Sequence, residues 1–226
     1  MLFSFLRNRE KAKNPILQLQ DDPSVRPLKT LVHVGAHLAQ ERELYERMGF
    51  QDVLWIEGAP ETYQRLQQSF SDSPDSSTVR HRLLCALLSE TSGEDVSFYR
   101  FSNAGASDSM FQATPQFQQK WPQLQQQAVP QKLQTSTLDD VVRSQGLAGK
   151  VDVLVVDVQG AELLVLKGGL QTLSNVQAVV CEVSTRPFYD GGVLYPELKD
   201  FLNAHGFRPS VAPRKTHCDL LFRRAA

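Results

Sequence analysis

The sequence predicts an α/β protein built on one doubly wound, mostly parallel β-sheet, and three observations lead to this prediction. From Thr30 onward, short apolar runs alternate with amphipathic stretches, as they do in successive βαβ units. The run at 52–57 is apolar on both faces, which is typical of a buried parallel strand. The length of 226 residues suits one such domain with decoration. We therefore expect an N-terminal extension at 1–29 and one domain at 30–226.

The first half of the domain is expected to supply three strands and two helices. The first strand ends in a glycine turn at Gly35, and a helix is expected from there to about Met48, where Gly49 stops it. Pro60 opens the second helix, because proline suits the first helical position. The strands expected here are 30–35, 52–57 and about 83–88, with a polar loop at 71–78 and an edge strand or hairpin at 94–101.

The second half of the domain continues the alternation. Thr137 starts a short helix that ends near Gly146, with a threonine in the position that caps a helix. A later helix is expected to carry one apolar stripe along its length, formed by Leu163, Leu166, Leu170 and Leu173. The remaining elements expected are strands at 151–157 and 176–183, a helix opened by Pro196 and ended by Gly206, and a closing antiparallel hairpin at 207–211 and 218–222.

One segment, 102–134, interrupts this pattern, and its part from 112 is rich in glutamine and proline. Glutamine enrichment is typical of a spacer of low complexity. The interspersed Phe117, Trp121 and Leu124 favour a segment that packs, such as a lid over an active site. The sequence leaves both interpretations open.

Composition and charge exclude several classes of protein. The formal net charge is −1, from 24 basic and 25 acidic residues, which is unlike a nucleic-acid binder. The three cysteines are too few and too scattered for a disulfide framework or a zinc site, which favours a reducing, cytoplasmic compartment. The apolar part of the N-terminus spans only 1–6 and precedes its basic residues, the reverse of a secretory signal. No window is long enough for a spanning helix, so we expect no stable membrane insertion.

Ligands of open parallel sheets bind beyond the carboxyl ends of the strands, so the residues at those ends are the candidates for a site. A glycine at 35 lets the backbone turn tightly and approach a ligand at a helix N-terminus. Glu57 ends the next strand 22 residues later, and its carboxylate suits the two hydroxyls of a ribose. This pair predicts a nucleoside site, either for NAD or for S-adenosylmethionine. The turn lacks the glycines of a pyrophosphate-binding loop, which favours S-adenosylmethionine.

Several stretches, in the right order over about 30–210, resemble the FkbM family of methyltransferases. The most specific are WIEGAP within GFQDVLWIEGAPETYQRL (49–66) and DVQGAELLVLKG within VDVLVVDVQGAELLVLKGG (151–169). The others are HVGAHLAQE (33–41), SNAGASDSMF (102–111), TSTLDDVV (135–142), CEVS (181–184), LYPELKDFL (194–202) and HGF (205–207).

The resemblance implies a class I methyltransferase fold, Rossmann-like, with a seven-stranded sheet and a C-terminal antiparallel hairpin, using S-adenosylmethionine. Members methylate hydroxyl oxygens of sugars, glycolipids or polyketide-type metabolites. The cofactor-binding residues it implies are Gly35, Ala36, His37, Glu57, Gly58, Ala86 and Asp157. The sequence departs from the family pattern at Ala39, where a glycine is common, and at Asp108, within a stretch usually rich in serine.

Two carboxylates at strand ends are the candidates for chemistry. Methyl transfer to oxygen needs a positioned hydroxyl and a base, and we take Asp157 as the first candidate and Glu182 as the second. Glu162 is placed either to stabilise a helix N-terminus or to serve the site. No fixed ligand spacing is present, so we expect no metal. The substrate-binding candidates are Asn103, Ser107, Ser109, Gln159 and Tyr189, with ordinary turn chemistry as the alternative for the loop residues.

The sequence thus predicts an S-adenosylmethionine-dependent O-methyltransferase acting on a small-molecule or glycan hydroxyl, without a nucleic-acid partner. A nicotinamide-dependent oxidoreductase shares the ribose acid and remains an alternative. A non-catalytic binding module with the same fold is the other. The acceptor, a homo-oligomeric state and the general base are not decided by the sequence.

Overall fold

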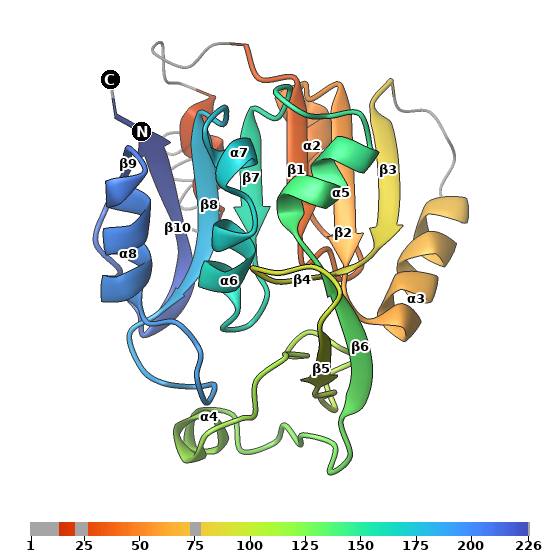
Figure 1. Ribbon diagram of the computed structural model, residues 1–226, viewed down its shortest axis with the longest axis vertical. Helices are drawn as coiled ribbons and strands as arrows, with labels where there is room; N and C mark the ends of the chain where they lie inside the picture. The colour runs from red at the N-terminus through yellow and green to blue at the C-terminus, as the bar shows by residue number, and fades with distance from the viewer. Residues whose placement is uncertain (1–13, 21–26, 73–77, 226) are drawn as a thin grey trace, which may run out of the picture.

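A computed structural model describes residues 14–20, 27–72 and 78–225, so part of the expected N-terminal extension and of the loop at 71–78 lies outside the described residues. The main sheet has seven strands in the order β3-β2-β1-β7-β8-β10-β9 (Figure 1). Their bounds are Thr30–Val34 for β1, Asp52–Glu57 for β2, Arg80–Cys85 for β3, Val153–Val156 for β7, Ala178–Ser184 for β8, Phe207–Pro209 for β9 and His217–Arg224 for β10. The five central strands make four parallel pairings, and β1 pairs with both β2 and β7, as expected of a doubly wound sheet.

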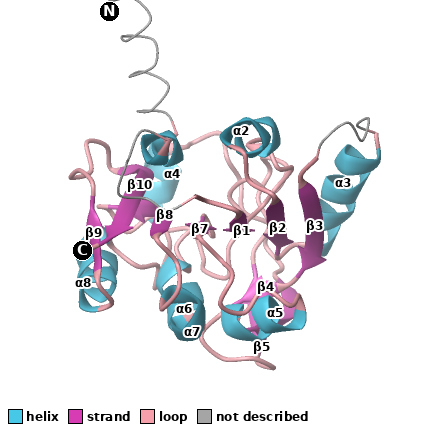
Figure 2. Cartoon of the chain, turned by 90° about the horizontal axis from the view of Figure 1, so that it is seen from above, coloured by secondary structure: helices cyan, strands magenta, loops and turns pink. Residues whose placement is uncertain are grey.

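Helices cover both faces of this sheet, as Figure 2 shows from above. One core contains the inward side chains of α5, α6, α7 and α8, and the other contains those of α2, α3 and a short 3₁₀ helix, η1. Alternate residues of each strand enter opposite cores, so Val32 belongs to the first and Leu31 to the second. The helices are η1 (Pro15–Leu19), α2 (Arg42–Met48), α3 (Pro60–Ser71), α4 (Pro115–Lys120), α5 (Leu138–Ser144), α6 (Glu162–Lys167), α7 (Leu170–Leu173) and α8 (Tyr195–Ala204).

The C-terminal strands form the expected antiparallel hairpin. β10 runs antiparallel to both β8 and β9 and lies between them, so its first residues come to the carboxyl end of β8. This register places Asp219 opposite Glu182 and His217 opposite Ser184. The predicted fold class, a mostly parallel seven-stranded sheet with a C-terminal antiparallel hairpin, is confirmed.

The segment 102–134 and its neighbours pack beyond the carboxyl ends of the parallel strands (Figure 1). A small sheet, β4-β6-β5, forms there from Leu87–Leu88, Gln131–Ser136 and Asp95–Phe98. Its aromatic neighbours form a third core, in which Phe117 is 1% exposed and packs against Trp121, Phe101 and Tyr189. The glutamine-rich part of the segment is therefore packed through its aromatic residues, and its role as a lid stays a prediction.

Two predicted elements differ in their bounds for reasons of local geometry. The strand expected at about 83–88 is two strands, because the chain leaves the main sheet after Cys85 and joins the small one at Leu87. The helix expected directly after Gly35 begins only at Arg42. Residues His37 and Ala39 have positive φ values of 46° and 54°, which no α-helix accommodates, so the intervening chain forms turns.

The helix predicted to carry four leucines on one stripe is broken in two. Gly168 and Gly169 separate α6 from α7, and Leu170 is 47% exposed instead of buried. Both glycines allow a close approach, because a Cβ on Gly168 would lie 2.2 Å from the carbonyl oxygen of Ser89 and one on Gly169 2.6 Å from Leu138. The expected cap at Thr137 is confirmed, since its hydroxyl accepts a hydrogen bond from the Asp140 amide at 3.1 Å.

Within 14–20, 27–72 and 78–225, none of the helices combines the length and the apolar character needed to span a lipid bilayer.

Candidate functional site

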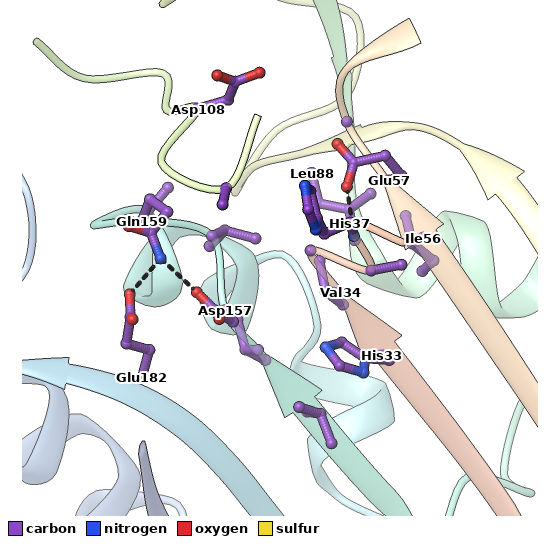
Figure 3. Close-up of a pocket in the computed structure, with 18 of the residues that line it drawn as sticks. His33, Val34, His37, Ile56, Glu57, Leu88, Asp108, Asp157, Gln159 and Glu182 are labelled. Atoms are coloured by element: carbon purple, nitrogen blue, oxygen red, sulfur yellow. Dashed lines mark hydrogen bonds between the residues drawn. The ribbon is translucent and has the colours of Figure 1, made fainter. Parts of the chain in front are cut away.

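A cavity of about 310 Å³ opens at the carboxyl ends of β1, β2, β7 and β8, where the sequence predicted a ligand site. Its lining comes from the turns after these strands, from the loop at 105–110 above them and from η1 and β10 beside them. Figure 3 shows Glu57 and His37 on one side of this space and Asp157, Gln159 and Glu182 on the other. A cavity of this volume lies within the range of about 300–1,000 Å³ that small-molecule sites usually have.

Glu57 is held rigidly at the first side of the cavity. It is 8% exposed, and its two carboxylate oxygens accept hydrogen bonds from the backbone amides of His37 and Ala59, each at 2.8 Å. Burial raises the pKa of Glu57, while these two amide hydrogen bonds lower it. Each oxygen keeps a lone pair for a further donor, so the carboxylate can accept two hydroxyl hydrogen bonds at once.

The glycine turn shapes the floor between the two sides. Gly35 has φ of +85°, and a Cβ there would lie 1.7 Å from the carbonyl oxygen of Asp157, so only glycine fits. The neighbouring His37 links this turn to the loop above, because its Nε2 lies 3.1 Å from the carbonyl oxygen of Ala104. Ala39, a departure from the family pattern, packs in the core beneath the turn, while Gly35, Ala36 and His37 line the cavity.

An apolar wall continues from Glu57 along the loop that follows β3. Gly58 and Ala86 line the cavity, and Leu87, Leu88 and Phe98 extend the wall. A Cβ on Gly58 would lie 3.0 Å from the Leu87 side chain, so this glycine lets β2 approach the wall closely. A flat, mostly apolar group fits this end of the cavity.

Asp108 closes the cavity above this wall. It is 8% exposed, accepts a hydrogen bond from the Phe101 amide at 2.7 Å and forms an ion pair with Arg100, which also binds Glu61 at 2.7 Å. Burial raises the pKa of Asp108, and the Arg100 charge opposes that rise. The departure from the family pattern at this position therefore anchors the loop at 105–110 to α3.

At the second side of the cavity, one amide joins two carboxylates. Gln159 Nε2 donates to Asp157 Oδ1 at 2.7 Å and to Glu182 Oε2 at 2.8 Å (Figure 3). The Tyr189 hydroxyl donates to Gln159 Oε1 at 2.7 Å, which fixes the orientation of the amide. Gln159 has a φ of +54°, so its side chain is aimed by a backbone conformation that non-glycine residues rarely adopt. The two predicted catalytic residues are thus adjacent.

The electrostatics of this second side are strongly acidic. Burial raises the pKa of Asp157 well above its ordinary range, and the charges of Glu182 and Asp219 raise it further. Burial also raises the pKa of Glu182 well above its ordinary range, with contributions from Glu162 and Asp219. Among the described residues that line the cavity there is no lysine or arginine. A carboxyl group with a raised pKa can take up a proton near neutral pH, as a general base must.

Glu162 lies behind these two carboxylates, within the α6 N-terminus. It is 3% exposed, and its Oε1 accepts hydrogen bonds from the Gly160 amide at 3.0 Å and the Val158 amide at 3.2 Å. The ligand oxygens of Asp157, Glu162 and Glu182 lie within 4.8 Å of one another. The expectation of no metal is not tested by this grouping and stays a prediction.

Glu162 also gives a prediction for stability against pH. Burial raises its pKa from 4.5 to about 7 in the folded protein. Between these values the unfolded chain releases the proton that the folded chain keeps, so the free energy of unfolding falls as the pH rises. We expect Glu162→Gln to remove this fall, a gain of up to about 3 kcal/mol relative to the parent protein at pH 8 and little at pH 4.5. Urea unfolding at both pH values measures it, and parallel pH dependences of the two proteins would contradict it.

The predicted substrate-binding residues occupy two different positions. Gln159 lines the cavity, whereas Ser109 and Tyr189 are 1% and 3% exposed and brace it from behind. The Ser109 hydroxyl donates to the Gln159 carbonyl at 2.7 Å. Asn103 and Ser107 bind each other within their own turn, at 2.8 Å. Contact of all five residues with a substrate stays a prediction.

Sequence reasoning missed three groups of residues at the site. Asn14, directly before η1, and Ile16, within it, line the cavity although they precede the expected domain. Glu41 and Asp219 add carboxylates to its acidic side. His217 binds Glu182 from outside the cavity. The predicted C-terminal hairpin was the available signal for Asp219 and His217, because its last strand returns the chain to the end of β8.

The profile of the methyltransferase FkbM domain family matches residues 33–209 of this chain. A 2-O-methyltransferase, NoeI, from Sinorhizobium fredii is 32% identical over 94 residues, which cover 42% of this chain and 38% of that protein. The chain therefore matches well under half the length of this curated relative.

Two solved structures are similar in fold. The FkbM methyltransferase of Methylobacillus flagellatus superposes with a TM-score of 0.54 at 14% identity, covering 88% of this chain and 45% of that one. The magnesium protoporphyrin IX methyltransferase of Synechocystis, solved with bound S-adenosylmethionine, has a TM-score of 0.51 at 10% identity, covering 97% of this chain and 81% of that one. At these identities the likeness establishes a shared fold.

Proposed function

We propose, from the premise that this chain belongs to the FkbM methyltransferase family, that it transfers the methyl group of S-adenosylmethionine to a hydroxyl oxygen of a sugar-type acceptor. The family and the cofactor expected from the sequence are both confirmed. The choice of oxygen, the acceptor class and the roles of single residues are the proposal. One observation supports it above the others, the pair of carboxylates that Gln159 holds side by side at the cavity.

The first side of the cavity fits the nucleoside part of the cofactor. Glu57 would accept hydrogen bonds from the two ribose hydroxyls. Each of its oxygens already accepts one from a backbone amide and has a lone pair left for a hydroxyl. The apolar wall at Gly58, Ala86 and Leu88 would hold the adenine ring. Gly35 would let the methionine part pass close to the backbone, where a side chain would collide.

The second side of the cavity fits the acceptor hydroxyl. When bound, the cofactor supplies an activated methyl group. Asp157 or Glu182 would accept the hydroxyl hydrogen bond, orient the oxygen for in-line attack and take the proton as the new O–CH₃ bond forms. Their raised pKa values suit a base that works near neutral pH. An acidic side without a lysine or arginine among its described lining residues favours a neutral acceptor over a phosphate or carboxylate.

The sugar class rests on two supports. The relative with 32% identity is a 2-O-methyltransferase by name. The second side of the cavity is lined by the polar groups of Asp157, Gln159 and Glu182, which suits a polyhydroxylated acceptor. We further propose that the protein is cytoplasmic, because all three cysteines are free, and that its acceptor is not a nucleic acid, because the net charge is −1.

The test is methyl transfer from S-adenosylmethionine labelled in its methyl group to a panel of mono- and oligosaccharides. We expect a methylated sugar whose label lies on oxygen, located by mass spectrometry and NMR. Asp157→Asn is expected to lower kcat roughly 100-fold, because loss of a general base usually costs 100- to 10,000-fold. Its Kd for S-adenosylhomocysteine is expected to change far less.

Asp200→Asn is the matched control, since that side chain is exposed on α8, away from the cavity. Label found on nitrogen or carbon of every methylated product would contradict the proposed O-methylation. Parent-like kcat in both Asp157→Asn and Glu182→Gln would remove the carboxylate pair from the chemistry.

A further inference from the structure

His217 lies directly behind the acidic side of the cavity and contacts Glu182, one of the two carboxylates that Gln159 binds. Its Nε2 lies 2.8 Å from Glu182 Oε1, the oxygen that Gln159 does not bind. Its Nδ1 lies 2.8 Å from the Ser184 hydroxyl. Glu182 therefore has one oxygen toward the cavity network and the other on an imidazole.

The pairing is built by the sheet. His217 and Asp219 start β10, and the antiparallel register sets His217 opposite Ser184 and Asp219 opposite Glu182. The imidazole packs edge-on against the rings of Trp121 and Phe188, with centroids 5.3 and 5.5 Å away. Its side chain is 15% exposed, so it connects a buried carboxylate with the protein surface.

We propose that His217 is a positioning residue that shares a proton with Glu182 and removes the proton that methyl transfer releases. This inference rests on the proposed function. As the acceptor oxygen bonds to the methyl carbon, the S–CH₃ bond breaks with its electron pair kept by sulfur. At rest one proton lies between Glu182 Oε1 and His217 Nε2, and Nδ1–H donates to the Ser184 hydroxyl. The acceptor hydroxyl proton passes to Glu182 Oε2 while the shared proton moves onto Nε2. The imidazolium then releases its Nδ1 proton to water through Ser184, which leaves the pair with as many protons as before.

The surroundings of His217 favour its neutral form, so the imidazole passes a proton on instead of keeping it. Burial lowers the pKa of His217, as does the ammonium of Lys120, while the nearby carboxylates oppose this shift. Lys120 lies over the ring of Trp121, 4.5 Å from its centroid. The charged groups that face His217 come from five elements and are Glu182 on β8, Lys120 at the end of α4, Asp157 after β7, Glu162 on α6 and Asp219 on β10.

The direct test is the NMR titration of the His217 imidazole in the full chain, which needs no acceptor. His217→Gln assigns the signal among the five histidines. In the parent protein the Glu182 carboxylate stabilises the imidazolium, so in Glu182→Gln the His217 midpoint is expected to move to lower pH. Glu197→Gln, an exposed carboxylate on α8, is the matched control and should leave it unchanged. An identical midpoint in Glu182→Gln and the parent protein would overturn the proposal.

Kinetics with the acceptor found in the sugar screen separate proton removal from simple support. His217→Gln keeps a donor for Glu182 but cannot take a proton, so we expect kcat to fall roughly 10- to 100-fold with KM for the cofactor unchanged. Added imidazole should restore part of the rate of His217→Ala. A His217→Gln protein with parent-like kcat and pH profile would leave His217 an anchor only. If Glu182→Gln shifts the His217 midpoint but no acceptor in the sugar screen is methylated, the proposed function is refuted and the proton-sharing pair of His217 and Glu182 remains.

Discussion

Glu57→Ala is expected to weaken binding of S-adenosylhomocysteine roughly 100-fold. Hydrogen bonds to a charged group contribute about 1.5–3 kcal/mol each, and the carboxylate is placed to accept two from the ribose. Tenfold in Kd corresponds to about 1.4 kcal/mol, so losing two such bonds amounts to at least two powers of ten. The measurement is isothermal titration calorimetry of the parent and variant proteins.

The change at Glu57 also frees two backbone donors, because the carboxylate holds the amides of His37 and Ala59. Thermal unfolding without ligand therefore accompanies the titration, to separate a collapsed loop from lost ribose contacts. Glu43→Ala is the matched control, since that glutamate is 89% exposed on α2. An unchanged Kd in a folded Glu57→Ala protein would remove Glu57 from the cofactor site.

Gly35→Ala is expected to abolish cofactor binding and to destabilise the fold. The left-handed φ of +85° costs a non-glycine residue about 1–2 kcal/mol. The added Cβ would lie 1.7 Å from the carbonyl oxygen of Asp157, and overpacking of this kind costs up to about 3 kcal/mol more. Because that oxygen belongs to the backbone of a candidate catalytic residue, any relaxation displaces the second side of the cavity as well. Urea unfolding and calorimetric titration measure the two effects.

Gly149→Ala isolates the conformational part of this effect. Its φ is +70°, and a Cβ there would meet nothing within 4 Å. We expect it to cost only about 1 kcal/mol and to bind cofactor as the parent protein does. Equal stabilities of the two variants would show that the backbone contact between Gly35, after β1, and Asp157, after β7, is looser than the structure has it.

The position of Glu57, Gly35, Asp157 and Glu182 could be predicted from the sequence because one physical rule governs all of them. The carboxyl ends of parallel strands meet at one edge of the sheet, so residues that end apolar runs come together without knowledge of the packing. The buried strands are strongly apolar, which makes their ends easy to locate. The structure brings all four to one cavity.

The partners of these residues could not be predicted, because they depend on register and on long-range packing. His217 meets Glu182 through the pairing of β10 with β8, and a shift of one residue would turn its side chain to the other face. Tyr189 reaches Gln159 across 30 residues, and this contact needs the aromatic core around Phe117 to position it. Local pattern contains none of this information.

The errors in helix bounds have a similar origin. Leucine spacing at 163–173 fits one continuous helix, but Gly168 and Gly169 are needed where the chain passes Ser89 and Leu138. The turn at 36–41 adopts left-handed conformations at His37 and Ala39, which aim the His37 amide at Glu57. In both places tertiary contacts outweigh helix propensity.

The most direct test of the account is a calorimetric titration of the purified chain with S-adenosylhomocysteine, with NAD⁺ as the comparison. A cavity with a ribose acid, an apolar adenine wall and no pyrophosphate loop predicts one-to-one binding of S-adenosylhomocysteine in the micromolar range and no heat from NAD⁺. Binding of NAD⁺ in place of S-adenosylhomocysteine would contradict the assignment of this cavity to methyl transfer.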